Sequence, residues 1–255
     1  MASPQASGVG SVLSADIAVP QHERELRFYS SVLTTGESPL WREDLMNSEG
    51  IPIIGLGEQN PAYADLPLQW MPHIQVADVA ASAERALARG GREFMHHKDD
   101  LGQSQWAVLV DPNGAAFGII PFVASEAVPS VGGGRIAWLD LTVADATETR
   151  DFYQDVVGWS AQDVQMEDAA GHYADYALYT LDGTAVAGVC HARGVNEDLP
   201  PVWLLCLPVG DLNESLIRAR EEGGEVVDAR KGSAGDYTHA VVRDPVGAYF
   251  ALVPG

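Results

Sequence analysis

Hydrophobic and polar positions along the chain follow two spacings that recur in a fixed order. From Arg135 to Ser160, a short apolar run is followed by apolar positions at helical spacing, and this pattern ends at Gly158. The order predicts a strand that leads into an amphipathic helix with one face packed on a sheet. A weaker copy opens the chain, with an expected strand at 11–19 and an expected helix at 23–33. The sequence therefore predicts a repeated strand–helix module.

Two further segments, beginning at Leu66 and Leu199, share a second version of the pattern. In the first of them, Asp78 is a good N-cap for an expected helix, and Gly90-Gly91 is the pair expected beyond its end. The Pro112–Gly114 segment then supplies the residues for a tight turn between two strands. Each segment is thus expected to form a strand, a helix and a strand pair.

Two constant offsets relate the halves of the chain. Asp16 and Asp140 are 124 residues apart, as are the pairs Phe28-Tyr29 and Phe152-Tyr153. Positions after the first helix of each half are 133 residues apart from Trp70 and Trp203 onward, so the second half carries nine extra residues before Trp203. An internal duplication is the economical explanation. A larger set of matched positions lies 133 residues apart: Trp70 and Trp203, Val76 and Val209, Asp78 and Asp211, Gly90-Gly91 and Gly223-Gly224, Asp111-Pro112 and Asp244-Pro245, Gly114 and Gly247, and Phe117 and Phe250.

The segment from Val123 to Arg135 has the composition of a linker, with small residues, a proline and consecutive glycines. Each half reads as a pair of βαβββ units, which gives four units in the chain. Because an isolated unit would expose one face of its sheet, the units must pair. We therefore expect an α+β fold with curved mixed sheets that form cups, in two tandem domains at 1–123 and 135–255, joined by a Gly/Pro linker at 124–134.

The amino-acid composition limits the classes of partner that the protein could bind. The chain has 36 acidic against 15 basic residues, a net charge of −21, which disfavours nucleic acid or an anionic membrane as a partner. A neutral or cationic small molecule suits this field better, although the charge is also what keeps many proteins soluble. Only Cys190 and Cys206 are present, and no signal peptide or bilayer-spanning segment is recognisable. We expect a soluble cytoplasmic protein, as a monomer or homodimer.

Several motifs resemble those of one known superfamily. FYSSVLT and FYQDVVGW end the first helix of each half, GG follows the second helix, and the DPNGAAF and DPVGAYF turns close the halves. Together these resemble the vicinal oxygen chelate superfamily, which includes glyoxalase I, extradiol dioxygenases, and fosfomycin and bleomycin resistance proteins. With WLDL in the opening strand, the chain is most similar to two-domain glyoxalase-like proteins of actinobacteria, including the mycobacterial 27-kDa antigen group. The resemblance covers nearly the whole chain and implies two tandem glyoxalase-like domains.

The resemblance also implies where a metal would be bound. Enzymes of the superfamily place His, Gln or Glu on four strands around a divalent ion, leaving positions open for two substrate oxygens. None of the residues at the corresponding positions is a plausible side-chain ligand for such an ion, so we expect neither a metal nor another cofactor. These positions fall on Ser14, Gly55, Met71 and Gly118 in the first half, and on Trp138, Gly188, Leu204 and Ala251 in the second.

Substitute ligands are few. Asp16 and His73 each lie two residues past one of these positions and face the same way along a strand, but two ligands make a poor site. Asp140 with Cys206 is the equivalent in the second half, where Cys206 is better explained as a small buried side chain. His96-His97 is expected in a solvated loop, because adjacent residues on an extended chain point to opposite faces.

Other catalytic arrangements have little support. Ser14 near Asp16 and His73 lacks the nucleophile elbow of a serine hydrolase. Cys190 and His191 are neighbours in sequence, which does not make them hydrogen-bond partners. The glycines before Arg135 precede a strand and not a helix, so they do not form a phosphate-binding loop. No catalytic residue is assigned.

Aromatic residues beside acids on the expected cup-lining strands predict a pocket for a flat or cationic ligand, held by stacking and charge. The alternative is that the tryptophans are core or contact residues. The candidate ligand-binding residues are Asp16, Trp70, His73, Trp106, Trp138, Asp140, Tyr173, Trp203, Cys206 and His239.

The leading hypothesis is a metal-free protein that binds a small apolar, aromatic or cationic molecule and sequesters it, such as an antibiotic or a natural-product intermediate. One alternative is a lyase, isomerase or oxygenase of natural-product or aldehyde metabolism. It would act through a degenerate metal site or by acid–base chemistry from Asp140, His239, Asp16 or His73. Another alternative is a structural or signalling pseudo-enzyme with filled cups. The second half is the better candidate because its opening motif is intact.

Overall fold

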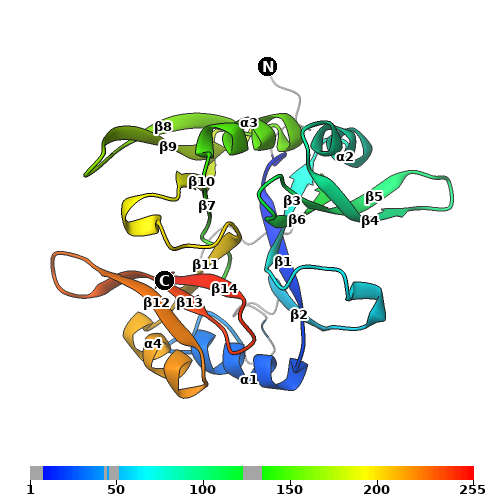
Figure 1. Ribbon diagram of the computed structural model, residues 1–255. Helices are drawn as coiled ribbons and strands as arrows, with labels where there is room; N and C mark the ends of the chain where they lie inside the picture. Colours follow the sequence, from blue (N-terminus) through cyan, green and yellow to red (C-terminus); the bar gives the residue numbers. More distant parts are fainter. Residues whose placement is uncertain (1–7, 43–44, 46–51, 123–133) are drawn as a thin grey trace. The chain divides into compact units, whose positions relative to one another are not determined.

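The computed structural model describes residues 8–42, 45, 52–122 and 134–255, so most of the expected linker lies outside the described residues. Helices and strands alternate along the chain as the repeat predicts (Figure 1). The helices are α1 (His22–Leu33), α2 (Val79–Ala88), α3 (Ala146–Val157) and α4 (Leu212–Glu221), with short 3-10 turns at Pro61–Tyr63 and Gly194–Asn196. The strands are β1 (Val12–Val19), β2 (Ile54–Glu58), β3 (Met71–Val76), β4 (Arg92–Lys98), β5 (Ser104–Val110), β6 (Ala116–Pro121), β7 (Trp138–Val143), β8 (Ser160–Asp168), β9 (Gly171–Tyr179), β10 (Ala185–His191), β11 (Trp203–Val209), β12 (Glu225–Lys231), β13 (Tyr237–Arg243) and β14 (Tyr249–Pro254).

Three modules share one topology, and we name them by their order in the chain. The second module pairs its strands in the order β3-β6-β5-β4, the third in the order β7-β10-β9-β8, and the fourth in the order β11-β14-β13-β12. In each, the first and last strands are parallel and the other pairs are antiparallel. The predicted α+β class with mixed sheets is confirmed.

The first module is shorter in its described part. Strand β1 pairs in parallel with β2, with Asp16 opposite Gly55. Between α1 and β2, the described residues form no strand beyond single bridging residues at Trp41 and Pro52. The described residues 34–42 offer no alternating apolar run that could form a half-buried strand.

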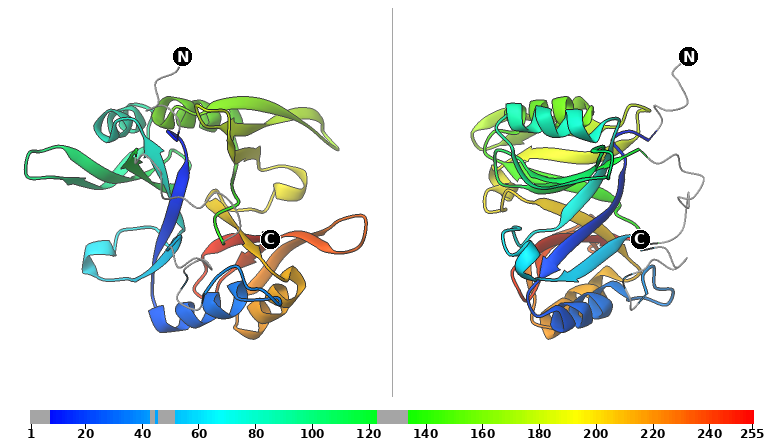
Figure 2. Two further views of the ribbon diagram at one scale, coloured as in Figure 1. Left: turned by 180° about the vertical axis from the view of Figure 1, so that it is seen from behind. Right: turned by 90° about the vertical axis from the view of Figure 1, so that its right-hand side faces the viewer.

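The chain folds as two compact units. Unit 1 consists of Met1–Leu13, Met71–Glu126 and Leu139–Trp203, and it holds the second and third modules with α2 packed on α3. Unit 2 consists of Ser14–Trp70, Ala127–Trp138 and Leu204–Gly255, and it holds the first and fourth modules with α1 packed on α4. Figures 1 and 2 show each helix pair side by side. Each half of the sequence thus contributes one module to each unit.

The helix ends follow from local sequence. Asp78, Asp145 and Asp211 each accept a hydrogen bond from a backbone N–H three residues on, which satisfies a free donor of the first turn. Gly158 ends α3 with a left-handed φ of 90°, a conformation that glycine adopts without steric cost. None of the helices in the described part of the chain combines the length and the apolar character needed to cross a bilayer.

The repeated FY and GG motifs meet inside each unit. In unit 2, a Cβ built on Gly224 would lie 2.7 Å from the Phe28 ring of α1, so only glycine allows this approach. In unit 1, a Cβ on Gly91 would lie 2.9 Å from the Ala86 carbonyl oxygen and 3.3 Å from the Phe152 ring. The second glycine of each pair therefore admits an aromatic ring from the helix of the other module.

Candidate functional site

Trp70 and Trp203 are core residues. Both are fully buried, and both indole N–H groups donate 2.9 Å hydrogen bonds, from Trp70 to the Tyr29 hydroxyl and from Trp203 to the Tyr153 hydroxyl. The sequence analysis placed these tryptophans in the lining of a ligand cup, with a core role as the alternative. The core role is the one observed for Trp70 and Trp203, because each indole ring lies edge-on against its partner tyrosine within an aromatic cluster.

The third module presents a polar face on the side of its sheet away from α3. Asp140 of β7 lies opposite Gly188 of β10, and Thr142 lies opposite Cys190. The other face is turned to the helix, since the Tyr176 hydroxyl of β9 lies 2.7 Å from Thr147 Oγ1 of α3. Side chains alternate along a strand, so the neighbours of Tyr176 in β9 point to the polar face with Asp140.

Asp175, beside Tyr176, holds His191 in place. One carboxylate oxygen, Oδ1, accepts the backbone N–H of His191 at 2.8 Å and lies 3.1 Å from His191 Nδ1. The other oxygen, Oδ2, is buried and has no hydrogen-bond partner among the described residues. Donation from Nδ1 to the carboxylate fixes the ring tautomer, which leaves Nε2 as the acceptor. The His191 side chain is 20% exposed, so it remains partly open to solvent.

Tyr173 and Arg193 flank this pair. The Arg193 guanidinium lies 4.1 Å over the centre of the Tyr173 ring, and it donates hydrogen bonds of 2.9 and 2.8 Å to the two Asp168 oxygens. The Tyr173 ring stands edge-on to His191, with 5.8 Å between centroids. Burial, and then the charges of Asp175 and Asp168, raise the pKa of Tyr173, so its hydroxyl stays protonated at neutral pH.

Unit 2 brings Cys206 of β11 close to His239 of β13. The Cys206 sulfur and a His239 ring nitrogen lie within 4.8 Å of each other. Cys206 is buried, as the sequence predicts for a small apolar side chain, and His239 Nδ1 is a buried atom without a hydrogen-bond partner in the described structure. Burial, and then the nearby Arg230 charge, lower the pKa of His239, which keeps the imidazole neutral.

The residues present do not fit the metal that the family resemblance implies. In unit 2, a Cβ on Gly55 would lie 2.5 Å from Asp16 Oδ1, so the neighbouring strand fills that position. In unit 1, His73 fills the space at Gly118 in the same way, at 2.8 Å. Met71, Leu204 and Ala251 are buried apolar side chains without a ligand atom suited to a hard cation, so we derive no step through a metal.

The remaining predicted residues are Trp106 and Trp138. Trp106 of β5 stacks on His97 of β4 with centroids 5.5 Å apart, and Trp138 begins β7. The prediction of a loop at His96-His97 is wrong, because both lie in β4. His96 accepts or donates hydrogen bonds of 2.8 Å to Glu93 and Ser104, and these contacts, with the Trp106 stack, hold the segment extended.

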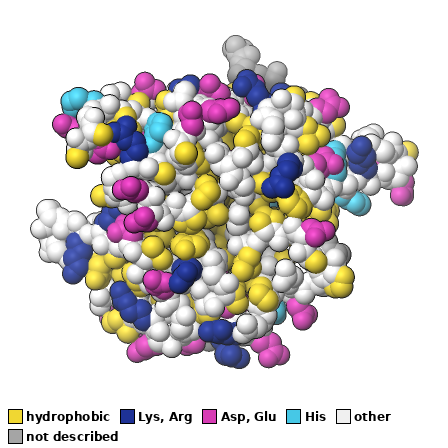
Figure 3. Space-filling model, viewed as in Figure 1, with side chains coloured by type: hydrophobic (Ala, Val, Ile, Leu, Met, Phe, Trp, Pro, Cys, Tyr) yellow, Lys and Arg dark blue, Asp and Glu magenta, His cyan; other side chains and the backbone are white. Residues whose placement is uncertain are grey.

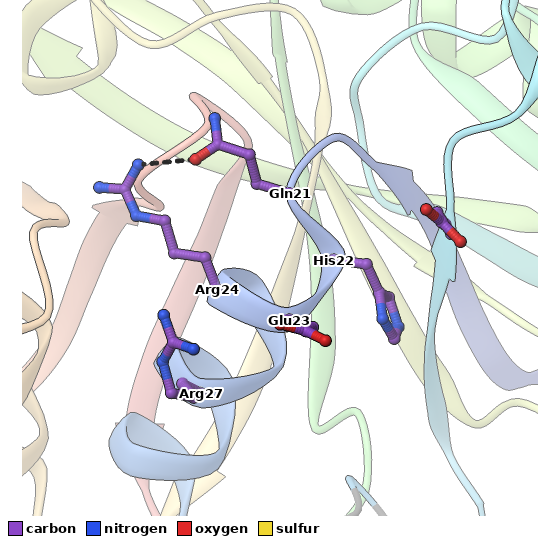
Figure 4. Close-up of a pocket in the computed structure, with 6 residues that line it drawn as sticks. Gln21, His22, Glu23, Arg24 and Arg27 are labelled. Carbon is purple, nitrogen blue, oxygen red and sulfur yellow. Dashed lines mark hydrogen bonds between the residues drawn. The ribbon is translucent and has the colours of Figure 1, made fainter.

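A polar cavity of about 490 Å³ opens at the start of α1, lined by Gln21, His22, Glu23, Arg24, Arg27 and Glu58. Figure 4 shows that its side chains diverge: Arg24 turns toward Gln21, while His22 points to the other side of the helix. Charged side chains are also dispersed on the face in Figure 3, where Asp and Glu lie among Lys and Arg. Neither this cavity nor the charged surface brings functional side chains together as a binding or catalytic site would.

Comparisons with known proteins agree with the fold. The sequence model described as Glyoxalase/Bleomycin resistance protein/Dioxygenase superfamily matches residues 135–252, and that of the Glyoxalase-like domain matches residues 13–120. The anthracycline biosynthesis protein DnrV of Streptomyces peucetius is 30% identical over 193 residues, which cover 74% of this chain and 66% of that protein. DauV of Streptomyces sp. (strain C5), also called an anthracycline biosynthesis protein, is 28% identical with the same coverage.

Solved structures show the same architecture at low identity. A catechol 2,3-dioxygenase aligns with a TM-score of 0.56 and 14% identity, covering 98% of this chain and 94% of that one. The 2,2',3-trihydroxybiphenyl 1,2-dioxygenase of Sphingomonas wittichii aligns with a TM-score of 0.56 and 15% identity, covering 97% and 91%. With both halves matched in sequence and the whole chain in fold, this protein belongs to the glyoxalase/bleomycin resistance/dioxygenase superfamily, the vicinal oxygen chelate proteins.

Proposed function

We propose that this chain binds a small aromatic molecule of natural-product metabolism with its own side chains, without the divalent metal of its superfamily. The observation that carries the proposal is the polar face of the third module. There, the acid Asp140 and the half-buried ring of Tyr173 share one side of a sheet, and Asp175 adds a second carboxylate. A flat ligand that is neutral or cationic suits aromatic and acidic groups together.

The relatives indicate the chemical class of the ligand. DnrV and DauV are called anthracycline biosynthesis proteins, and anthracyclines are flat, fused aromatic ring systems. Because the aligned region spans 66% of their length, their role as whole proteins comes to this chain only as part of the proposal. The absence of metal-ligating side chains at the superfamily positions separates this chain from the dioxygenases it resembles in fold.

Binding of the anthracycline daunorubicin, followed through its own fluorescence, tests the proposal. We expect saturable one-to-one binding, weakened about tenfold or more by Tyr173→Ala, since loss of an aromatic contact costs roughly 1.4 kcal/mol. Asp140→Asn is expected to weaken binding of this cationic ligand as well. His172→Gln is the matched control, because His172 neighbours Tyr173 in β9 but its side chain is 79% exposed. The proposal fails if daunorubicin does not bind, or if both Tyr173→Ala and Asp140→Asn bind it like the wild type.

Acid–base catalysis is the second candidate function. The Asp175–His191 hydrogen bond favours it, because the same carboxylate–imidazole arrangement prepares a histidine to accept a proton.

A further inference from the structure

We propose that Asp175 and His191 form a general-base pair that moves a proton on an enolisable aromatic ketone. The inference rests on the proposed function for delivery of an aromatic ligand to the third module. The pair itself stands on geometry within β9 and β10 of unit 1. His191 accepts the proton, and Asp175 is a positioning residue that acts through the imidazole.

The first feature of the pair is the way one oxygen of Asp175 holds His191. Asp175 Oδ1 receives both the backbone N–H and the Nδ1 side of His191, so main chain and ring are anchored by the same atom. The backbone hydrogen bond fixes the main chain, and the ring cannot turn without losing its own hydrogen bond to the buried carboxylate. The Nε2 lone pair therefore keeps a fixed direction, which a positioned base requires.

The second feature is the other carboxylate oxygen of Asp175. Asp175 is 3% exposed, and its Oδ2 has no hydrogen-bond partner among the described residues. A buried acceptor without a partner costs roughly 1–3 kcal/mol, so folding alone would favour a residue without this atom. With no second donor dividing its charge, the carboxylate is free to stabilise the imidazolium that forms when His191 takes a proton.

The third feature is the arrangement of the charges near Asp175. Arg193 is the cation close to Tyr173, and it is committed to Asp168 through two hydrogen bonds. The Tyr173 hydroxyl is held protonated, since burial and the neighbouring carboxylates raise its pKa. Among the described residues, His191 is the one ion-pair partner of Asp175, so the field of the carboxylate acts on the imidazole.

Proton transfer from the ketone to His191 needs no co-reactant. His191 Nε2 takes a proton from the carbon next to the ketone carbonyl. The C–H electron pair forms the new C=C bond, and the carbonyl π pair moves to oxygen as an enolate. Return of the proton from the imidazolium to the same carbon gives exchange, and return to a conjugated carbon gives an isomer.

Hydrogen–deuterium exchange of 2-tetralone, a simple bicyclic enolisable ketone, tests the inference. Loss of its C1 and C3 protons in D2O is followed by NMR with the full chain, and the rate is compared with that of imidazole at equal concentration. We expect the protein to exceed imidazole by about 10²-fold or more, because a positioned base contributes about 10²–10⁴-fold. His191→Gln should remove the excess rate, Asp175→Asn should reduce it at least tenfold, and Asp175→Glu should restore part of it.

His172→Gln is again the control, since it removes an exposed histidine from the same strand and should exchange like the wild type. Thermal melting checks that each variant is folded. If Asp175→Asn is unfolded, the two single variants His191→Gln and Asp175→Glu test the inference in its place. A wild-type rate no higher than that of imidazole, or a full rate in His191→Gln, overturns the inference.

Binding measured on the same samples separates the two proposals. Daunorubicin binding without 2-tetralone exchange overturns the base pair and leaves the proposed function standing. Exchange that depends on His191, without daunorubicin binding, supports the base pair and overturns the proposed ligand class.

Discussion

Tyr29 donates a 2.9 Å hydrogen bond to Asp244, although 215 residues separate them. Tyr153 and Asp111 form the matching contact in the other unit, at 3.3 Å. In both, a helix tyrosine of one module reaches the Asp-Pro turn of another. The same aspartates accept backbone N–H groups of their own turns, and Trp70 or Trp203 donates to the tyrosine. The most repeated motifs of the sequence thus join modules together.

Removing these hydroxyls should destabilise the protein. In Tyr29→Phe and Tyr153→Phe, a buried indole N–H and a buried carboxylate each lose a partner, at a cost of about 1–3 kcal/mol. Urea unfolding measures this loss. Tyr63→Phe, at an exposed tyrosine, should change the free energy of unfolding by less than about 0.5 kcal/mol. Variants at Tyr29 and Tyr153 that are as stable as the Tyr63 control would show that the relays do not contribute.

Unit 2 carries a buried acid, Glu25, at a position where unit 1 has Thr149. Glu25 is fully buried in α1, and neither of its oxygens has a hydrogen-bond partner in the described structure. Burial, and then the neighbouring charge of Asp244, raise the pKa of Glu25 to about 8. Asp244 accepts hydrogen bonds from Tyr29 and from three turn N–H groups, so it is the better place for the charge. The proton of the pair therefore resides on Glu25.

Stability should fall as pH rises from about 4.5 to about 8, because the folded state then binds a proton that the unfolded chain releases. The slope from this group is at most roughly 1.4 kcal/mol per pH unit. Glu25→Gln should flatten the curve over this window and be more stable than the wild type at pH 8, whereas Glu23→Gln, at an exposed site, should not. Equal slopes for Glu25→Gln and the wild type in urea unfolding would contradict this.

A double variant can copy unit 1 into unit 2. Thr149 and Asn113 occupy the positions equivalent to Glu25 and Val246, and Asn113 Nδ2 donates to Thr149 Oγ1 at 2.9 Å. Glu25→Thr with Val246→Asn should therefore give a hydrogen-bonded pair without a titrating group. We expect the same flat pH profile as Glu25→Gln and a free energy of unfolding at pH 8 above that of the wild type. A double variant that is less stable at pH 8 than either single change would show that the two turns are not interchangeable.

The close approach at Gly224 gives a further prediction. A Cβ there would meet the Phe28 ring at 2.7 Å and the Arg243 carbonyl oxygen at 3.0 Å. Gly224→Ala should therefore overpack the core and cost about 1–3 kcal/mol. Gly57→Ala is the control, since its nearest contact would be an ordinary 3.8 Å. Denaturant unfolding that gives the same change for both would remove the steric explanation of the second glycine.

The sequence predicts elements well where a local pattern determines them. Asp78 as an N-cap and Gly158 as a helix end depend on neighbours in the chain, and both are confirmed. The contact between Phe28 and Gly224 could not be predicted from a local pattern, because the two residues are distant in sequence and neither motif indicates that it packs against the other. His96-His97 was misread because its extended form depends on Trp106 across a hairpin.

The Asp175–His191 pair was missed for a related reason. From the sequence, His191 is weighed only with its neighbour Cys190. The pairing depends on the register of β9 and β10, which contains an irregularity between Ala185 and Ala187. A shift of one residue would turn Asp175 to the other face, so composition and spacing could not fix it. The available signal was the presence of an acid, Asp175, and a histidine, His191, in one segment of the second half.

The metal content of the purified protein tests whether the residues at the metal-ligand positions of the superfamily bind a divalent ion. Because Leu204 and Ala251 offer no ligand and Asp16 covers Gly55, we expect protein purified without chelator to hold less than stoichiometric divalent metal. Treatment with EDTA should leave the melting temperature and the proposed daunorubicin binding unchanged, since the proposal assigns neither to a bound ion. Elemental analysis by mass spectrometry measures the first quantity directly. Stoichiometric metal in the wild type that is lost in Cys206→Ala or His239→Gln would contradict the prediction and move the chemistry of this protein to that pair.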